Sequence, residues 1–218
     1  MQYQVNISID PHSLQQLLAT GQMIAVVKKV TSNPAAPSAP SVIWTAVHPL
    51  VTTTVAWTDS YTLFATSTQI VVGANISVAA ESGVVSTGST HAFNAAGQFV
   101  DAGSGAASAI ALVNQSAHVS NFGLAQAAVV NGRSQMGPTN VIGIHQNVQA
   151  AFVPTEMVLL FVSQTARAGQ VVAHLPPNAL TVELSSAKPQ VHVVFDGGRG
   201  GFRAQRGAML IPSRLELR

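Results

Sequence analysis

The sequence contains no cysteine among its 218 residues, and charged residues make up only 8% of it. Without cysteine the chain has no disulfide bond, no thiolate nucleophile and no cysteine-ligated zinc. The charged share is about a third of that in an average globular protein. Two interpretations fit: either much surface is buried in an oligomer, or a neutral surface rich in Ser and Thr faces water.

Long apolar runs are also missing. The longest, residues 157–162, has the length of a strand, whereas a membrane-spanning helix needs about 18 apolar residues or more. Residues 1–11 show neither the basic nor the apolar region of a secretory signal peptide. We therefore expect no transmembrane segment and a cytoplasmic protein, with export by a route without a cleaved signal as the alternative.

The few positive charges are unevenly distributed. Half of the ten Lys and Arg residues lie in the last twenty positions, at Arg199, Arg203, Arg206, Arg214 and Arg218. Arg/Gly segments bind RNA or phosphates, but only residues 197–201 and Arg203 match such a segment here. The adjacent residues Lys28 and Lys29 form a second, minor group of positive charge. We favour a glycine turn with a basic, solubilising tail (Arg199, Arg203, Arg206), and expect no nucleic-acid partner.

Apolar residues recur with the period of a β-strand. At the N-terminus Tyr3, Val5, Ile7 and Ile9 alternate with polar residues, which predicts a half-buried strand. Similar short runs follow at roughly even spacing, separated by turn signals such as Asn131-Gly132. The pattern predicts one all-β domain over residues 1–218, an antiparallel, jelly-roll-like β-sandwich of about ten to twelve strands.

One short helix interrupts this pattern near the N-terminus. Asp10 has the side chain of an N-cap, and Pro11 suits the first helical position. Gly21 supplies a C-terminal stop. We expect a helix between Asp10 and Gly21, with an apolar face of Leu14, Leu17 and Leu18.

Several stretches carry weaker signals. Residues 32–40 hold three prolines and predict a surface loop, while the Val- and Ile-rich residues 69–79 predict a strand. Residues 81–105 are rich in Gly, Ser and Ala, and we interpret them as a long connection with room for two short strands, which would serve as a lid, an interface arm or a plain loop. Residues 197–218 are expected to form an Arg/Gly turn and a final strand.

Aromatic residues make up only 6% of the chain, and the densest group comprises Trp44, Trp57, Tyr61 and Phe64. Exposed beside Asp59, such rings would stack on a sugar or enter a lipid headgroup region. The alternative is that they fill the core through packing between neighbouring strands. We favour core packing, and retain Trp44, Trp57, Asp59 and Tyr61 as candidate ligand-binding residues.

Candidates for catalysis are few. The seven histidines show none of the tight spacings of a metal site, although His145, His174 and His192 lie on or beside expected strands and form the best trio. The eight carboxylates include no close pair, and there is no nucleophile elbow or phosphate-binding loop. We expect no catalytic residue, metal or cofactor, and favour a protein without enzymatic activity over an enzyme.

Three functions remain open. The general profile resembles that of small lectins and sandwich-type cytolysins, a likeness of class that does not fix function. The leading hypothesis is a non-enzymatic binding or self-assembling β-sandwich that forms homo-oligomers, since low charge favours contacts between sheet edges or faces. The first alternative is a lectin-like or cytolysin-type module that binds a glycan or lipid headgroup through the aromatic group. The second is a small hydrolase or His-ligated metalloenzyme.

Overall fold

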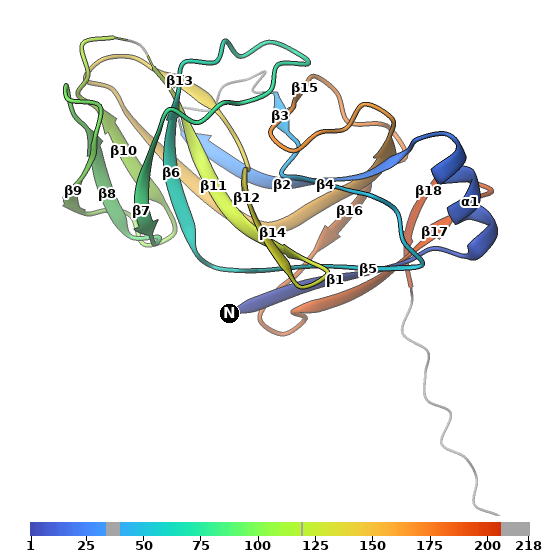
Figure 1. The fold of residues 1–218 in the computed structure, drawn as a ribbon. Helices are drawn as coiled ribbons and strands as arrows, with labels where there is room; N and C mark the ends of the chain where they lie inside the picture. Colours follow the sequence, from blue (N-terminus) through green and yellow to red (C-terminus); the bar gives the residue numbers. More distant parts are fainter. Residues whose placement is uncertain (34–39, 119, 206–218) are drawn as a thin grey trace, which may run out of the picture.

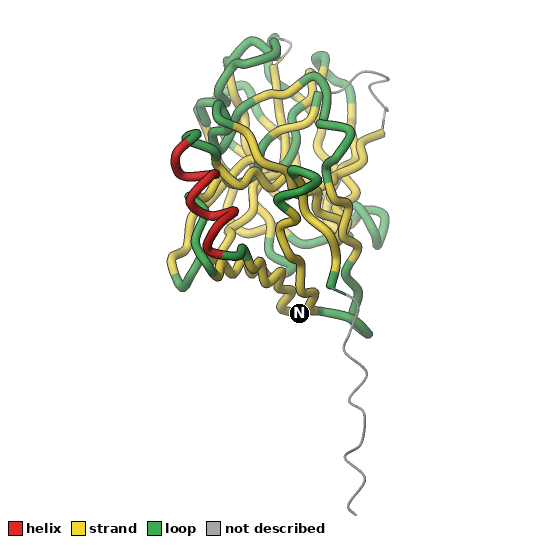
Figure 2. Tube along the Cα trace, turned by 90° about the vertical axis from the view of Figure 1, so that its right-hand side faces the viewer, coloured by secondary structure: helices red, strands yellow, loops and turns green. Residues whose placement is uncertain are grey.

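The computed structural model describes residues 1–33, 40–118 and 120–205. These residues form strands in three sheets and a single helix, α1 (Pro11–Ala19), as Figures 1 and 2 show. The predicted all-β sandwich with a short N-terminal helix is thus confirmed. The described part holds eighteen strands rather than about ten to twelve, partly because single expected runs divide. The run 141–151, for example, divides at Asn147, whose φ is 59°.

The first sheet has nine strands: β1 (Gln2–Ser8), β5 (Thr52–Thr58), β6 (Tyr61–Thr66), β7 (Ala80–Val85), β11 (Ser120–Val130), β12 (Arg133–Pro138), β13 (Ile142–Ile144), β17 (Gln190–Asp196) and β18 (Gly201–Ala204). Strands β5 and β6 follow one another along β11. Their other sides pair with β1 and β7. Beyond β1 come β17 and β18, and beyond β11 come β12 and β13. Strand β18 therefore lies at one edge of this sheet and the β12/β13 pair at the opposite edge.

The second sheet has seven strands: β2 (Met23–Asn33), β4 (Thr45–Val47), β8 (Ser89–Phe93), β9 (Phe99–Ser104), β10 (Ile110–Asn114), β14 (Gln149–Ser163) and β16 (Leu180–Glu183). Its order is β4-β2-β14-β10-β8-β9, with β16 also paired to β14. A small third sheet joins β3 (Ser41–Val42) to β15 (Val171–Val172). Two pairings, β1–β17 and β8–β10, are parallel, so the sandwich is mixed rather than wholly antiparallel.

Alternating side chains of the two large sheets form the core. Val5 and Ile7 of β1 pack with Ile24 and Val26 of β2 in one apolar cluster that also contains both tryptophans. A second cluster, centred on Phe122, fills the other part of the sandwich toward β8 and β9. The alternation read from the N-terminal residues is confirmed, because β1 buries every second side chain.

Two expectations about the middle of the chain are wrong. Residues 81–105 form β8, β9 and most of β7 instead of a long connection. The β8–β9 turn is closed by the Asn94 side chain, whose Oδ1 accepts hydrogen bonds from two backbone N–H groups. Phe93 and Phe99 flank that turn, and their rings pack together at a tilted angle of 55°. Residues 69–79 form turns and one isolated bridge rather than a strand.

The helix begins as the sequence predicts. Asp10 Oδ1 accepts hydrogen bonds from the backbone of His12 and Ser13. The predicted apolar face is narrower than expected, because Leu17 is buried but Leu18 is 54% exposed. Within the part of the chain that the structure describes, no helix has the length and apolar character to cross a membrane.

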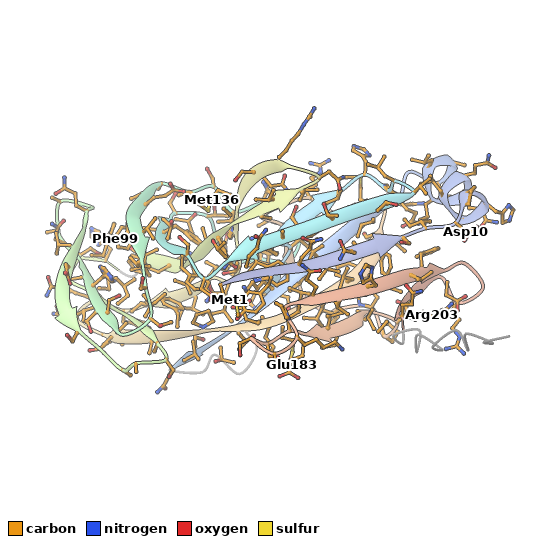
Figure 3. All side chains as sticks on the ribbon, turned by 90° about the horizontal axis from the view of Figure 1, so that it is seen from below. Met1, Asp10, Phe99, Met136, Glu183 and Arg203 are labelled. Atoms are coloured by element: carbon orange, nitrogen blue, oxygen red, sulfur yellow. The ribbon has the colours of Figure 1, made fainter. Side chains whose placement is uncertain are left out.

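The Arg/Gly turn and final strand expected over residues 197–218 can be compared with the structure only up to residue 205. Residues 197–200 form the expected turn, and β18 follows it. The final strand expected after β18 falls in residues 206–218, outside the described residues. Figure 3 shows Arg203 of β18 near the end of the molecule that carries Asp10, with Phe99 at the opposite end.

Candidate functional site

The aromatic side chains singled out in the sequence surround a lysine. The Lys28 ammonium lies 4.9 Å from the ring centroid of Trp57, 5.7 Å from that of Tyr61 and 5.8 Å from that of Trp44. These distances are those of cation–π contacts. The rings of Trp44 and Trp57 also meet edge to face. We call this arrangement the lysine cage.

The alternation of β2 places Lys28 inside the sandwich. Ile24, Val26 and Lys28 share one face of the strand, and the first two belong to the core cluster of both tryptophans. The Lys28 side chain has no exposed area. Lys28 is therefore buried and only Lys29, which is exposed, can act as the minor group of positive charge that the sequence indicates.

A single carboxylate neutralises the buried ammonium. Lys28 Nζ donates to Glu156 Oε2 at 2.9 Å, and Trp57 Nε1 donates to the same oxygen at 2.5 Å. The Tyr61 hydroxyl donates to Oε1 at 3.2 Å. Glu156 lies where the register between β14 and β2 shifts, between Pro154 and Val158. Such an irregularity re-aims a side chain, here toward the interior.

The cage shifts the ionisation of its members. Burial lowers the pKa of Lys28 to about 8 although Glu156 acts in the opposite direction. Burial alone would raise the pKa of Glu156, but the Lys28 ammonium and the hydrogen bond from Trp57 hold that pKa below its ordinary value. Burial, followed by the Glu156 and Asp59 charges, raises the pKa of Tyr61. At neutral pH Lys28 and Glu156 therefore form an ion pair.

The geometry makes the cage a structural element. An amine with a lowered pKa has the nucleophilicity of a Schiff-base lysine, but the Lys28 amine is sealed from solvent. Trp44, Trp57 and Tyr61 are each at most 4% exposed, so their faces are covered. This is the core packing that the sequence favours over an exposed ligand site.

The strand arrangement differs from the expected one, because Trp57 and Tyr61 lie on strands placed end to end along β11 rather than side by side. Asp59, the fourth candidate, lies at the surface and accepts a 3.2 Å contact from the Met1 ammonium. The structure thus brings three candidates together around Lys28 and leaves Asp59 outside the cage. The sequence missed Glu156, since only the β14 bulge directs it inward.

Comparisons with protein-family models, curated proteins and solved structures find no match for this chain. The assignment of a site therefore depends on the geometry of the chain itself.

The remaining candidates from the sequence do not assemble. Among the described residues no three His, Asp or Glu side chains are close enough to hold a metal ion, so His145, His174 and His192 are not gathered. Arg199 and Arg203 are exposed, 3.9 and 3.8 Å from Asp196. Arg206 lies outside the described residues.

The structure shows a further feature that no sequence pattern indicates, an open flank of the sandwich along β2. Strand β4 pairs with β2 only from Ile24 to Val26. On that side no strand of the described residues pairs with positions 28–33. The Trp44 N–H donates to the Val26 carbonyl, so the backbone groups of Lys28, Val30 and Ser32 face the same flank by the alternation of the strand.

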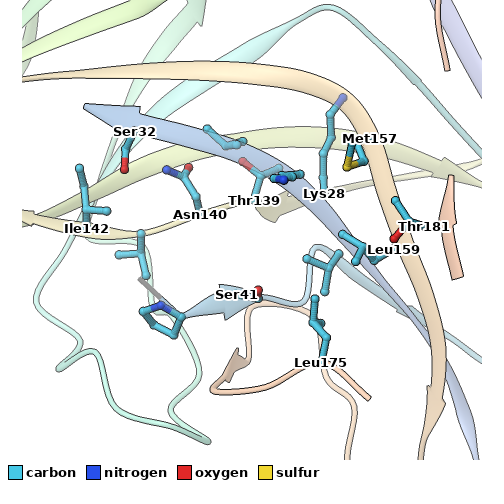
Figure 4. A pocket seen from close by; sticks show the side chains of 15 residues that line it. Lys28, Ser32, Ser41, Thr139, Asn140, Ile142, Met157, Leu159, Leu175 and Thr181 are labelled. Atoms are coloured by element: carbon cyan, nitrogen blue, oxygen red, sulfur yellow. The ribbon is translucent and has the colours of Figure 1, made fainter. Parts of the chain in front are cut away.

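A cavity of about 320 Å³ lies along this flank. Figure 4 shows Ser32, Asn140 and Ile142 at one end of it and Leu159, Leu175 and Thr181 at the other. The lining thus joins the β2 edge of one sheet to the β12–β13 connection of the other. Two lysines, Lys28 and exposed Lys29, are among the lining residues, but the Lys28 ammonium points away from the cavity, toward β14 (Figure 4). We call this cavity the flank groove.

Close packing beside β4 sets where the flank groove begins. Gly137 of β12 lies against the Trp44 carbonyl so closely that a Cβ would overlap it. The Gln135 amide also donates to the Thr45 hydroxyl. These contacts close the flank where β4 is present, and the groove opens where β4 ends. Because its walls come from residues about a hundred positions apart, no local sequence signal could have predicted it.

Proposed function

We propose that this protein is a non-enzymatic assembly protein whose copies associate by strand addition at the flank groove. The observation that carries the proposal is the part of β2 beside which the described residues place no strand: backbone donors and acceptors of Lys28, Val30 and Ser32 face the flank groove. An exposed strand edge is a template for an added strand. Extended segments bind such edges through main-chain hydrogen bonds, and adjacent pockets hold alternate side chains.

The composition supports association rather than a charged binding surface. With 8% charged residues, little charge repulsion opposes contact between copies. The Lys28–Glu156 pair is neutral overall, so it adds no net charge to the surface.

The other functions receive less support. A glycan or lipid-headgroup site needs an exposed aromatic face, and Trp44, Trp57 and Tyr61 are buried. An enzyme needs a reactive group that a substrate can reach, and the Lys28 amine is enclosed. The partly apolar flank groove, which no carboxylate of the described residues lines, fits a protein segment better than a glycan, a lipid headgroup or a substrate.

Native molar mass measured by light scattering at two protein concentrations and two salt concentrations tests the proposal. We expect a defined oligomer with a mass at least twice 22.5 kDa, little affected by salt because few charges are involved. A 22.5 kDa species at every concentration would overturn the proposal.

A matched pair of variants localises the association. Ser32→Pro removes a backbone N–H that faces the groove, and proline is tolerated at an unpaired strand edge. Ser32→Ala keeps that N–H. We expect Ser32→Pro to lower the native mass and Ser32→Ala to leave it unchanged, with equal thermal unfolding temperatures showing that both fold. Equal masses for the two variants would exclude the β2 edge as the interface.

A further inference from the structure

We propose that the segment bound in the flank groove is the C-terminal segment, residues 206–218, of a neighbouring copy. This inference rests on the proposed function and names the partner of the same site. It makes each copy both a donor of a strand and an acceptor of one.

The sequence of the C-terminal segment suits a strand added at an edge. Over residues 213–218, which follow Pro212, Leu215 and Leu217 share one parity, and Arg214, Glu216 and Arg218 share the other. In an extended conformation, side chains of one parity lie on one face. The apolar face matches the apolar lining residues of the groove, such as Ile142, Leu159 and Leu175, and the charged face is left to solvent.

The topology places the start of this segment away from one end of the groove of its own copy. Strand β18 forms one edge of the nine-stranded sheet. The end of the groove at Asn140 and Ile142 lies at the opposite, β12/β13 edge, whereas its other end, at Thr181, lies on β16, which contacts β18. Figure 1 shows β18 beside α1 at the right, whereas β3 and β13 lie nearer the top.

The direction of β18 increases this separation. The strand starts at Gly201, next to Asn178, and reaches Gln205, whose N–H donates to the His192 carbonyl. It therefore leads the chain away from the loop that carries Leu175, a lining residue. For residues 206–218, the groove of a neighbouring copy is therefore easier to reach than the groove of their own copy.

Such a contact joins two different surfaces, the C-terminal segment of one copy and the groove of the next. Two copies can exchange segments reciprocally and close as a dimer, or successive copies can form a ring. In both cases the number of occupied grooves equals the number of bound segments.

Mixing two variants tests the inference. The first copy carries Ser32→Pro, so its groove is blocked and its C-terminal segment is intact. The second copy carries Leu215→Asp and Leu217→Asp, so its segment is disrupted and its groove is intact. Each variant alone is expected at 22.5 kDa, and the equimolar mixture is expected to form a dimer, because each mixed pair has one intact segment and one intact groove.

The control variant is Arg214→Gln, which alters the opposite parity of the segment and should keep the wild-type mass. If Ser32→Pro fails to fold, Ser41→Trp, which fills the groove from β3, replaces it. Persistent oligomers of the Leu215→Asp, Leu217→Asp variant would exclude the segment as the occupant while leaving self-association standing. Monomers in the equimolar mixture would exclude exchange between copies, and a monomeric wild type would overturn both proposals.

Discussion

Lys28 carries a positive charge into the core, where Glu156 and three aromatic rings hold it. Removing one partner of such a pair costs more than the pair contributes, because the other charge stays buried alone. The two partners differ in access to water: the Lys28 side chain has no exposed area, whereas that of Glu156 is 16% exposed. Removing Glu156, which leaves the Lys28 charge buried alone, should therefore cost more free energy of unfolding than removing Lys28.

We accordingly expect Glu156→Gln to lower the free energy of unfolding by about 3 kcal/mol and Lys28→Met by about 2 kcal/mol. The double variant should cost less than the sum of the two, since it leaves no lone charge. Chemical denaturation measures all three values, and Lys29→Met, at an exposed neighbour, should change the free energy by no more than about 0.5 kcal/mol. Additive effects would show that the two groups are not coupled.

The lowered pKa of Lys28 predicts a pH dependence of stability. Lys28 has a pKa of about 8 in the folded protein and about 10.4 in an unfolded chain, so between these values the unfolded state binds more protons. The free energy of unfolding then rises with pH, by about 2 kcal/mol from pH 8 to pH 10. Above pH 10 the raised pKa of Tyr61 acts in the opposite direction, because only the unfolded tyrosine loses its proton.

Denaturation curves at pH 7.5, 9 and 10 check this prediction. Lys28→Met serves as the control, because a chain without this amine should lack the rise. A wild-type profile parallel to that of Lys28→Met would show that the Lys28 pKa is not lowered in the folded protein.

At the scale of elements, the approach of β12 to β4 depends on a residue without a side chain. A Cβ at Gly137 would overlap the Trp44 carbonyl oxygen, and a backbone atom cannot rotate away as a side chain can. Gly137→Ala should therefore lower the free energy of unfolding by about 2 kcal/mol or more, measured by chemical denaturation. Gly83→Ala in β7, where a Cβ meets nothing within 4 Å, should stay within about 0.5 kcal/mol of wild type.

Sequence reasoning succeeded for elements with strong local signals. The alternation in β1, the Asp10 cap of α1 and the Asn131-Gly132 hairpin each depend on neighbouring residues, and each is present. Residues 81–105 carry only a weak strand signal in their sequence, because their strands gain stability from distant contacts such as that of Phe93 with Phe122. Propensity is a weak guide where tertiary packing decides.

The candidate site shows the same difference between features that depend on neighbouring residues and features that depend on distant contacts. Of the aromatic group that the sequence indicates, Trp44, Trp57 and Tyr61 surround Lys28. Phe64 packs in a separate apolar cluster. Composition gives no reason to expect a buried lysine. Only the pairing of β2 with β14 places Glu156 128 residues away within 2.9 Å of it. The flank groove depends on where β4 ends, which is again a property of strand pairing.

At the scale of the whole molecule, the flank groove competes with a second candidate interface. Strands β7 and β9 end the two sheets at the same side of the molecule and contact each other. Neither contains Lys or Pro, the residues that protect edges, and Val84 and Val100 on them are 75% and 42% exposed.

If association depends on the flank groove, the double variant Val84→Lys, Val100→Lys should keep the wild-type native mass. Lysine at an edge blocks strand addition there, and both side chains already face solvent, so the fold should tolerate the change. Light scattering of this variant beside Ser32→Pro distinguishes the two surfaces. A monomer from the lysine variant, with Ser32→Pro still oligomeric, would assign assembly to the β7/β9 end and leave the flank groove without a partner strand.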